Sequence, residues 1–303
     1  MFIISDEVQR ARELDAPIVA LESTVITHGL PTPQNMELAL AMEEKVRGEG
    51  AIPATIALLD GQIRVGIGEP ELERLAYTKD PVKVSRRDFA KVITKKLDGG
   101  TTVAGTMLAS QKAGIKVFAT GGIGGVHKES YLDISTDLQA LADTPMIVVC
   151  AGAKSILDLP ATLEYLETMA VPVVGYGTDE FPAFFSRHSG LGVSVRLDSP
   201  EEIAAFAKAH WDLGMKSAIL VTNPIPEEHS LDDEFINPII AQASADAQAK
   251  GIHGQALTPF LLARINELSG GKSLASNLVL LHNNATLAAK IAKVMGGGEE
   301  KNI

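Results

Sequence analysis

The chain has 303 residues, of which 46% are hydrophobic and 21% are charged, so it can bury a large core and lacks the composition of a disordered chain. A formal net charge of −11 argues against nucleic acid as a partner, because an acidic protein repels polyanions. Cys150 is the single cysteine, so no internal disulfide can form, which fits a reducing cytoplasm.

Residues 1–14, MFIISDEVQRAREL, lack the basic and apolar regions of a signal peptide. No apolar stretch approaches the roughly 20 residues that a membrane-spanning helix needs. We therefore expect a soluble, cytoplasmic protein with no membrane partner.

Short apolar runs that alternate with helical patterns predict a largely parallel sheet covered by helices. Each run is bounded by Gly, Pro or Asp, as in strands buried on both faces; the runs are 18–21, 55–59, 115–119, 146–150, 171–175, 193–197 and 218–221. In segment 58–67, Asp60-Gly61 separates two apolar runs and predicts a hairpin. The sheet should therefore be mixed.

Helical periodicity predicts helices over 33–47, 199–212, 258–268 and 273–295. The second opens with Ser199 and has Glu202 three residues later, which is a capping-box pattern. The polar segment 223–233 reads as a loop rather than a linker. We expect residues 1–303 to form a single α/β domain.

Two segments place a polar side chain after a predicted strand, where α/β sheets hold their ligands. In 146–158, MIVVCAGAKSILD, Lys154 could be a desolvated amine that attacks a carbonyl and forms an imine, or a solvated lysine at a helix start. In 19–28, VALESTVITH, Glu22 could act as an acid or a base, or be paired structurally.

Two further segments could bind an anion or a metal. The run 118–127, FATGGIGGVH, could hold an anion with its backbone N–H groups or form a tight turn, and His127 breaks the dinucleotide fingerprint. In YLDISTDL, the oxygens of Asp133, Ser135 and Asp137 suit Mg²⁺ or Mn²⁺. These residues could equally cap the helix that follows.

The segment KVSRRD, 83–88, has three cations in five residues. It could clamp a phosphate or form a solvated helix start. Asn277, Asn283 and Asn284 lie in an otherwise apolar helical stretch, and each needs a partner if buried, either substrate or a neighbouring element.

Taken together, these segments resemble the pseudouridine-5′-phosphate glycosidase family. The resemblance extends from about residue 17 to about residue 292 and is carried by long motifs in the family's order. These are ALESTVITHGLP, IPATIALLDG, KVSRRDF, TTVAGTM, IKVFATGGIGGVH, LDISTDLQ, VVCAGAKSILDLP, FPAFFSR, VTNPIPEE, TPFLLARINELSGG and SLASN.

The resemblance implies an enzyme that reversibly cleaves the C–C glycosidic bond of pseudouridine 5′-phosphate, giving uracil and ribose 5-phosphate. It also implies a three-layer α/β/α sandwich, a homotrimer and a divalent metal, generally Mn²⁺. Lys154 would form the imine with C1′ of the opened ribose, and Glu22 would protonate the uracil carbon. Asp133 would contact the metal largely through waters. The substrate would be held by Lys83, Val103, His127, Ser135, Thr136, Asp137 and Asn277.

This chemistry suits the bond, because carbon is a poor leaving group and an imine at C1′ provides an electron sink. Lys83 and the glycine loop 121–125 are our candidates for a phosphate anchor, since remote binding energy positions the reacting centre. Asp137 could relay a proton during ring opening. Two other readings stay open: a different Schiff-base lyase or aldolase for a sugar phosphate, and a catalytically silent binding protein.

Overall fold

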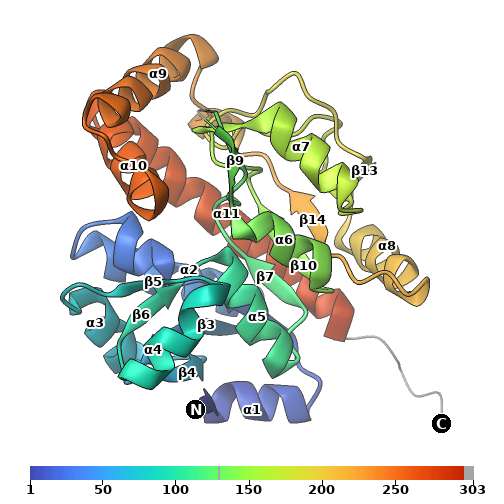
Figure 1. The fold of residues 1–303 in the computed structure, drawn as a ribbon. Coiled ribbons are helices and arrows are strands. Elements are labelled where there is room, and N and C mark those ends of the chain that lie inside the picture. Colours follow the sequence, from blue (N-terminus) through green and yellow to red (C-terminus); the bar gives the residue numbers. More distant parts are fainter. Residues whose placement is uncertain (129, 297–303) are drawn as a thin grey trace.

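The computed structural model describes residues 1–128 and 130–296 (Figure 1). In this part of the chain an 11-stranded sheet follows the order β1-β4-β3-β2-β7-β10-β14-β12-β13, with β6 paired to β3 and β5 paired to β6. Its strands are β1 (Phe2–Ile4), β2 (Ile18–Leu21), β3 (Ile52–Leu59), β4 (Gln62–Val65), β5 (Val82–Val84), β6 (Gly99–Thr101), β7 (Val117–Ala119), β10 (Ile147–Cys150), β12 (Val173–Tyr176), β13 (Val195–Leu197) and β14 (Ile219–Thr222).

Helices cover both faces of this sheet. On one face lie α2 (Gln34–Gly48), α8 (Pro200–Asp212) and the long α11 (Lys272–Gly296), and on the other α5 (Val103–Ala113), α6 (Thr136–Asp143) and α7 (Leu159–Thr168) (Figure 1). The remaining helices are α1 (Asp6–Glu13), α3 (Glu69–Tyr77), α4 (Phe89–Lys95), α9 (Asp233–Ala249) and α10 (Leu257–Leu268). The predicted three-layer α/β/α sandwich is confirmed.

The sheet is mixed, as predicted. Pairs among β2, β7, β10, β14, β12 and β13 are parallel, whereas β3 pairs antiparallel with β4 and β6. The β3–β4 hairpin turns at Asp60 and Gly61, with φ of 51° and 71°. Two successive positive φ values match the turn that Asp-Gly favours between twisted strands.

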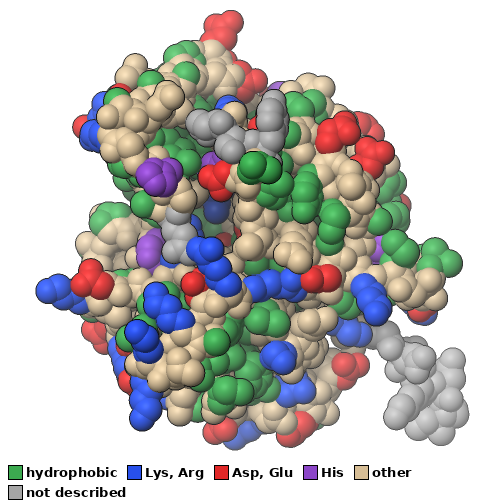
Figure 2. Space-filling view, in the orientation of Figure 1, with side chains coloured by type: hydrophobic (Ala, Val, Ile, Leu, Met, Phe, Trp, Pro, Cys, Tyr) green, Lys and Arg blue, Asp and Glu red, His purple; other side chains and the backbone are tan. Residues whose placement is uncertain are grey.

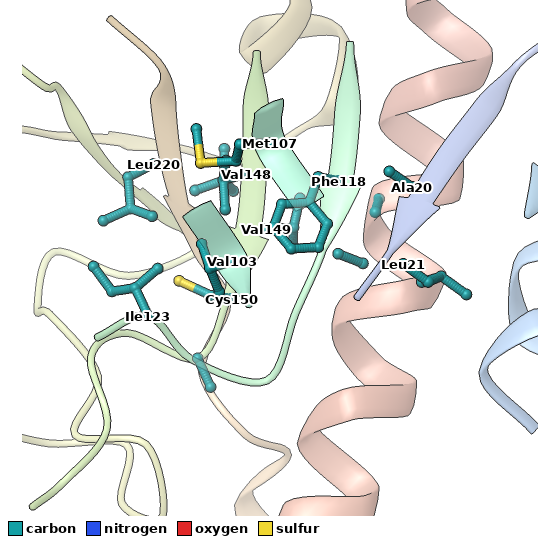
Figure 3. Close-up of a cluster of buried hydrophobic side chains, with 14 of the residues drawn as sticks. Ala20, Leu21, Val103, Met107, Phe118, Ile123, Val148, Val149, Cys150 and Leu220 are labelled. Atoms are coloured by element: carbon teal, nitrogen blue, oxygen red, sulfur yellow. The ribbon is translucent and has the colours of Figure 1, made fainter. Parts of the chain in front are cut away.

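The core lies between the central strands and the two helical layers. β10 and β14 are buried along their whole length, which explains why their sequences are continuous apolar runs. Phe118 and Val149 in the sheet pack near Val103 and Met107 of α5 (Figure 3). Cys150 is fully buried among them, and burial raises the pKa of its thiol to about 12, so it behaves as a small apolar side chain.

The apolar pattern did not predict the shortest strands. A separate three-stranded sheet consists of β8 (Val126–His127), β9 (Ser130–Ile134) and β11 (Leu157–Asp158). Two or three residues are too few to show an alternating pattern. Strand β6 begins with Gly99-Gly100, which has no apolar side chain to indicate a strand. A Cβ at Gly100 would lie 2.3 Å from Thr27 Oγ1. Glycine is needed there for close packing.

Candidate functional site

A cavity of about 370 Å³ lies at the carboxyl edge of the central parallel strands. Such edges are where α/β sheets hold ligands. Figure 2 shows a hollow near the centre of the face it presents, with basic and histidine side chains around it. The cavity is lined by all ten residues that the family resemblance assigned to the site, namely Glu22, Lys83, Val103, His127, Asp133, Ser135, Thr136, Asp137, Lys154 and Asn277.

Glu22 is the first residue after β2 and faces the cavity from an otherwise enclosed position. Burial raises the pKa of its carboxyl group above the usual value, while the nearby Lys154 charge and a hydrogen bond donated by Thr120 Oγ1 oppose this rise. The protonated form of Glu22 therefore persists to a higher pH than in water. A group of this kind can donate a proton to a bound ligand.

Lys154 follows β10, and Lys83 comes from β5 on the other side of the cavity. Burial lowers the pKa of Lys83, and the positive charge of Lys154 lowers it further. Asp137 and Glu22 act in the opposite direction, since their negative charges favour the ammonium form. The four side chains therefore face one another as two amines and two carboxyl groups in one enclosed space.

A short loop, 120–124, lies against the segment that leads to Lys154. Ala151 N donates to Gly121 O at 2.8 Å, Ile123 N to Gly152 O at 3.1 Å, and Lys154 N to Ile123 O at 3.1 Å. A Cβ at Gly122 would lie 2.6 Å from the Phe184 ring, and one at Gly124 would lie 2.2 Å from Ser135 Oγ. Glycine is therefore required for this packing.

Asp137 links three parts of the site. Its Oδ1 accepts from Ala104 N at 2.9 Å, at the start of α5, and its Oδ2 accepts from Gly124 N at 2.8 Å, at the end of the loop. Ser135 caps α6 by accepting from Asp137 N at 3.2 Å. The Asp137 side chain is 6% exposed, so these bonds fix the carboxylate in place. Its proton-relay role stays a hypothesis, and its bonds favour a positioning role.

The three cations of segment 83–88 have different surroundings. Arg86 forms a paired bond with Asp143, at 2.7 and 2.5 Å, and does not line the cavity. Lys83 and Arg87 do line it, and the Arg87 side chain is 73% exposed at the surface. Two of the three are therefore available to an anion.

The predicted metal residue, Asp133, lies in the cavity wall. Among the described residues, no group of three or more His, Cys, Asp and Glu side chains is placed to enclose a metal ion. Asp137 already uses both of its oxygens for backbone N–H groups. A Mg²⁺ or Mn²⁺ ion beside Asp133 would therefore have to keep most of its waters.

Of the three asparagines of α11, one faces the cavity and two bond to neighbouring elements. Asn277 lines the cavity, whereas Asn283 donates to Pro224 O at 3.1 Å and Asn284 donates to Thr120 O at 2.8 Å. Position along the helix decides which side chain meets the cavity. The Nδ1 atom of His127 is buried and, within residues 1–128 and 130–296, has no hydrogen-bond partner.

Several residues of the cavity lining were not predicted to belong to the site, and Thr120 and His28 are the two with the clearest polar contacts. Thr120 is the first residue after β7, and that position was the signal available for it. His28 belongs to a single π-helical turn, η1 (Val25–Gly29), and its Nδ1 lies 2.7 Å from Thr27 Oγ1. Burial lowers the pKa of His28, and the Lys83 charge lowers it further, which favours neutral imidazole in the cavity.

An amine, a buried acid and basic side chains in a cavity at the strand ends define an α/β enzyme site of the kind that handles small anionic substrates. The chain matches the family described as "Indigoidine synthase A like protein" over residues 7–294. It is 55% identical to the pseudouridine-5′-phosphate glycosidase of Caldanaerobacter subterraneus subsp. tengcongensis, and 95% of each chain is covered. It is 53% identical to the one of Geobacillus kaustophilus, over 96% of this chain and 97% of that one.

Two solved structures are similar over nearly the whole fold. The prealnumycin C-glycosynthase AlnA, in complex with ribulose 5-phosphate, has a TM-score of 0.90 and 40% identity, covering 98% of this chain and 97% of that one. An indigoidine synthase A-like protein from Thermotoga maritima has a TM-score of 0.90 and 35% identity with the same coverage. The chain therefore belongs to the indigoidine synthase A-like family, whose matched relatives include pseudouridine-5′-phosphate glycosidases, and the predicted family is confirmed.

Proposed function

We propose that this protein cleaves the C–C glycosidic bond of pseudouridine 5′-phosphate reversibly, giving uracil and ribose 5-phosphate through an imine on Lys154. The observation that carries the proposal is that Lys154 and Glu22 face one cavity and interact electrostatically there. An amine and a protonated acid are the two groups that this reaction needs. The names of the relatives give the substrate, since they are pseudouridine-5′-phosphate glycosidases.

In the proposed reaction, the Lys154 amine bonds to C1′ as the C1′–O4′ bond breaks and O4′ takes a proton. The nitrogen lone pair then forms the C1′=N bond while the bond from C1′ to the uracil carbon breaks. That electron pair takes the proton of Glu22, whose pKa burial raises. Water hydrolyses the imine and releases ribose 5-phosphate, which returns the free amine.

The phosphate would be held by the basic side of the cavity. Lys83, Arg87 and His127 line the cavity. Gly121, Gly122 and Gly124 bring backbone close to the cavity. Binding energy at the phosphate would position C1′ against Lys154.

Asp133 would hold a divalent cation, Mn²⁺ by preference, through bound waters. When bound, such an ion supplies positive charge that offsets substrate oxygens. Asn277 would contact the base or the sugar from α11. We also propose a cytoplasmic homotrimer. Among the described residues, no helix combines the length and apolar character that crossing a membrane requires.

The test uses ribose 5-phosphate and Mn²⁺, followed by borohydride reduction and peptide mass spectrometry. We expect an adduct on Lys154 in the wild type and none in Lys154→Met, while Lys83→Met should still trap. Uracil release from pseudouridine 5′-phosphate is measured separately. Trapping without uracil release would point to another sugar-phosphate lyase, and no adduct in the folded, metal-loaded protein would point to a binding protein.

A further inference from the structure

We propose that Asn284, a buried residue of α11 outside the cavity wall, is a positioning residue that sets the placement of Glu22 relative to Lys154. It would act through the loop 120–124, which contacts both groups. This inference rests on the proposed function, because it assigns a role within that reaction.

Asn284 is fully buried, and its side-chain hydrogen bonds reach residues directly after β7 and β14. Its Nδ2 donates to Thr120 O at 2.8 Å and lies 3.4 Å from Gly121 O, directly after β7. Its Oδ1 accepts from Asn223 Nδ2 at 3.2 Å, directly after β14. Asn223 N in turn donates to Cys150 O at 2.8 Å, at the end of β10. The Asn284 amide therefore joins the ends of β7 and β14, and the backbone of Asn223 extends this link to β10.

The loop that Asn284 holds contacts the side chain of Glu22 and the backbone of Lys154. At its first residue, Thr120 Oγ1 donates to Glu22 Oε1. At its middle, Ile123 O accepts from Lys154 N at 3.1 Å. Asp137 fixes the other end through Gly124 N at 2.8 Å. A displacement of the loop would therefore move the acid and the amine relative to each other.

Helix α11 and the loop 120–124 are in close contact, which leaves little room for a different side chain to bridge them. A Cβ at Gly121 would lie 3.1 Å from Leu281 Cδ2 and 3.3 Å from Leu280 Cδ1, on the preceding turn of α11. Asn283, the neighbour of Asn284, points elsewhere and donates to Pro224 O at 3.1 Å. An amide at 284 is thus the group that joins α11 to the loop by hydrogen bonds.

The effect on chemistry follows from the Thr120 hydrogen bond, which stabilises the ionised form of Glu22 and lowers its pKa. The charges that also act on Glu22 come from Lys154, Asp137 and Lys83, and a substitution at 284 removes none of these charges. If the loop loosens, the hydrogen bond weakens and the Glu22 pKa rises further. The alkaline limb of the kcat profile should then move to higher pH, while kcat itself falls because the acid is misplaced.

The experiment compares Asn284→Leu with Asn283→Ala in uracil release from pseudouridine 5′-phosphate as a function of pH. For Asn284→Leu we expect kcat to fall on the order of 10- to 100-fold, with KM changed less than about threefold, and the alkaline limb to move upward. Asn283→Ala should keep the wild-type profile. Thr120→Val should move the limb in the same direction, and the double variant Asn284→Leu with Thr120→Val should be no worse than the poorer single variant.

A folded Asn284→Leu with wild-type kcat and an unmoved alkaline limb would overturn the proposal. If Asn284→Leu fails to fold, Asn223→Ala replaces it, because this variant removes the side chain that orients the Asn284 amide. Additive effects of Asn223→Ala and Thr120→Val on kcat would then refute the coupling between Asn284 and the Thr120 hydrogen bond. If the wild type releases no uracil, the proposed function fails, and the rate of borohydride trapping at Lys154 becomes the readout. Asn284→Leu, or its Asn223→Ala replacement, should slow trapping and Asn283→Ala should not; equal rates would refute the positioning role.

Discussion

Replacing Asp137 with Asn separates a positioning carboxylate from a proton relay. Both Asp137 oxygens accept backbone N–H groups, from Ala104 at 2.9 Å and from Gly124 at 2.8 Å, and the side chain is 6% exposed. Asn has one acceptor oxygen, so its NH₂ group must face one of these two donors. One charge-assisted hydrogen bond is lost and one buried N–H is left without a partner.

The expected cost follows from these two losses. A hydrogen bond to a charged group contributes about 1.5–3 kcal/mol, and an unsatisfied buried donor costs about 1–3 kcal/mol. The losses overlap, so we expect Asp137→Asn to destabilise the protein by about 2–4 kcal/mol. For a chain of 303 residues the midpoint of thermal unfolding should fall by roughly 3–6 °C.

The assay pairs thermal unfolding, followed by circular dichroism, with turnover measured well below the unfolding temperature. A positioning role predicts that Asp137→Asn lowers both the midpoint and kcat. Loss of turnover with an unchanged midpoint would refute this reasoning and favour the proton relay. Full turnover with an unchanged midpoint would exclude both roles.

Three further predictions concern other parts of the site. Glu22→Gln should abolish uracil release. Because burial raises the folded-state pKa of Glu22, the contribution of this group to wild-type stability is fully present below about pH 4.5 and is lost as pH rises through the raised pKa. The stability of Glu22→Gln, measured by urea unfolding, should lack this fall with pH. Lys83→Met should lower kcat/KM about 10- to 100-fold. Since the Lys83 charge lowers the Glu22 pKa, the variant should also move the alkaline limb of the kcat profile to higher pH, and an unmoved limb would show that the two groups do not interact. Gly124→Ala places a Cβ 2.2 Å from Ser135 Oγ and should cost about 1–3 kcal/mol in stability as well as activity, whereas Gly48→Ala, where nothing lies within 4 Å, should be silent in both assays.

The sequence predicted the central strands and the site on them for the same physical reason. Strands buried on both faces must be apolar throughout, so β10 and β14 are visible as continuous runs. A polar residue that follows such a run closely lies at the carboxyl edge. Glu22 comes directly after β2, and Lys154 comes three small residues after β10, which is how both could be singled out. The long motifs then supplied the substrate and the roles, which residue patterns alone left open.

Other features depend on contacts that the sequence does not contain. Arg86 and Arg87 are adjacent in the chain, yet one is paired with Asp143 and the other lines the cavity. Asn277 and Asn284 are seven residues apart on the same helix, and only the former reaches the cavity. Each distinction is made by a partner distant in sequence, so it becomes visible only in the folded chain.

An acidic protein can hold a phosphorylated substrate because the interactions that decide binding are short-range. The net charge of −11 is spread over the whole chain, and salt screens exposed charges beyond about 8 Å at physiological ionic strength. Inside the cavity, Lys83 and Lys154 are only partly exposed and stand within interaction range of Glu22 and Asp137. Their charges act in a medium that screens less than water. The same enclosure that raises the Glu22 pKa therefore strengthens the attraction of these lysines for an anion, and one structural feature serves both the acid and the anchor.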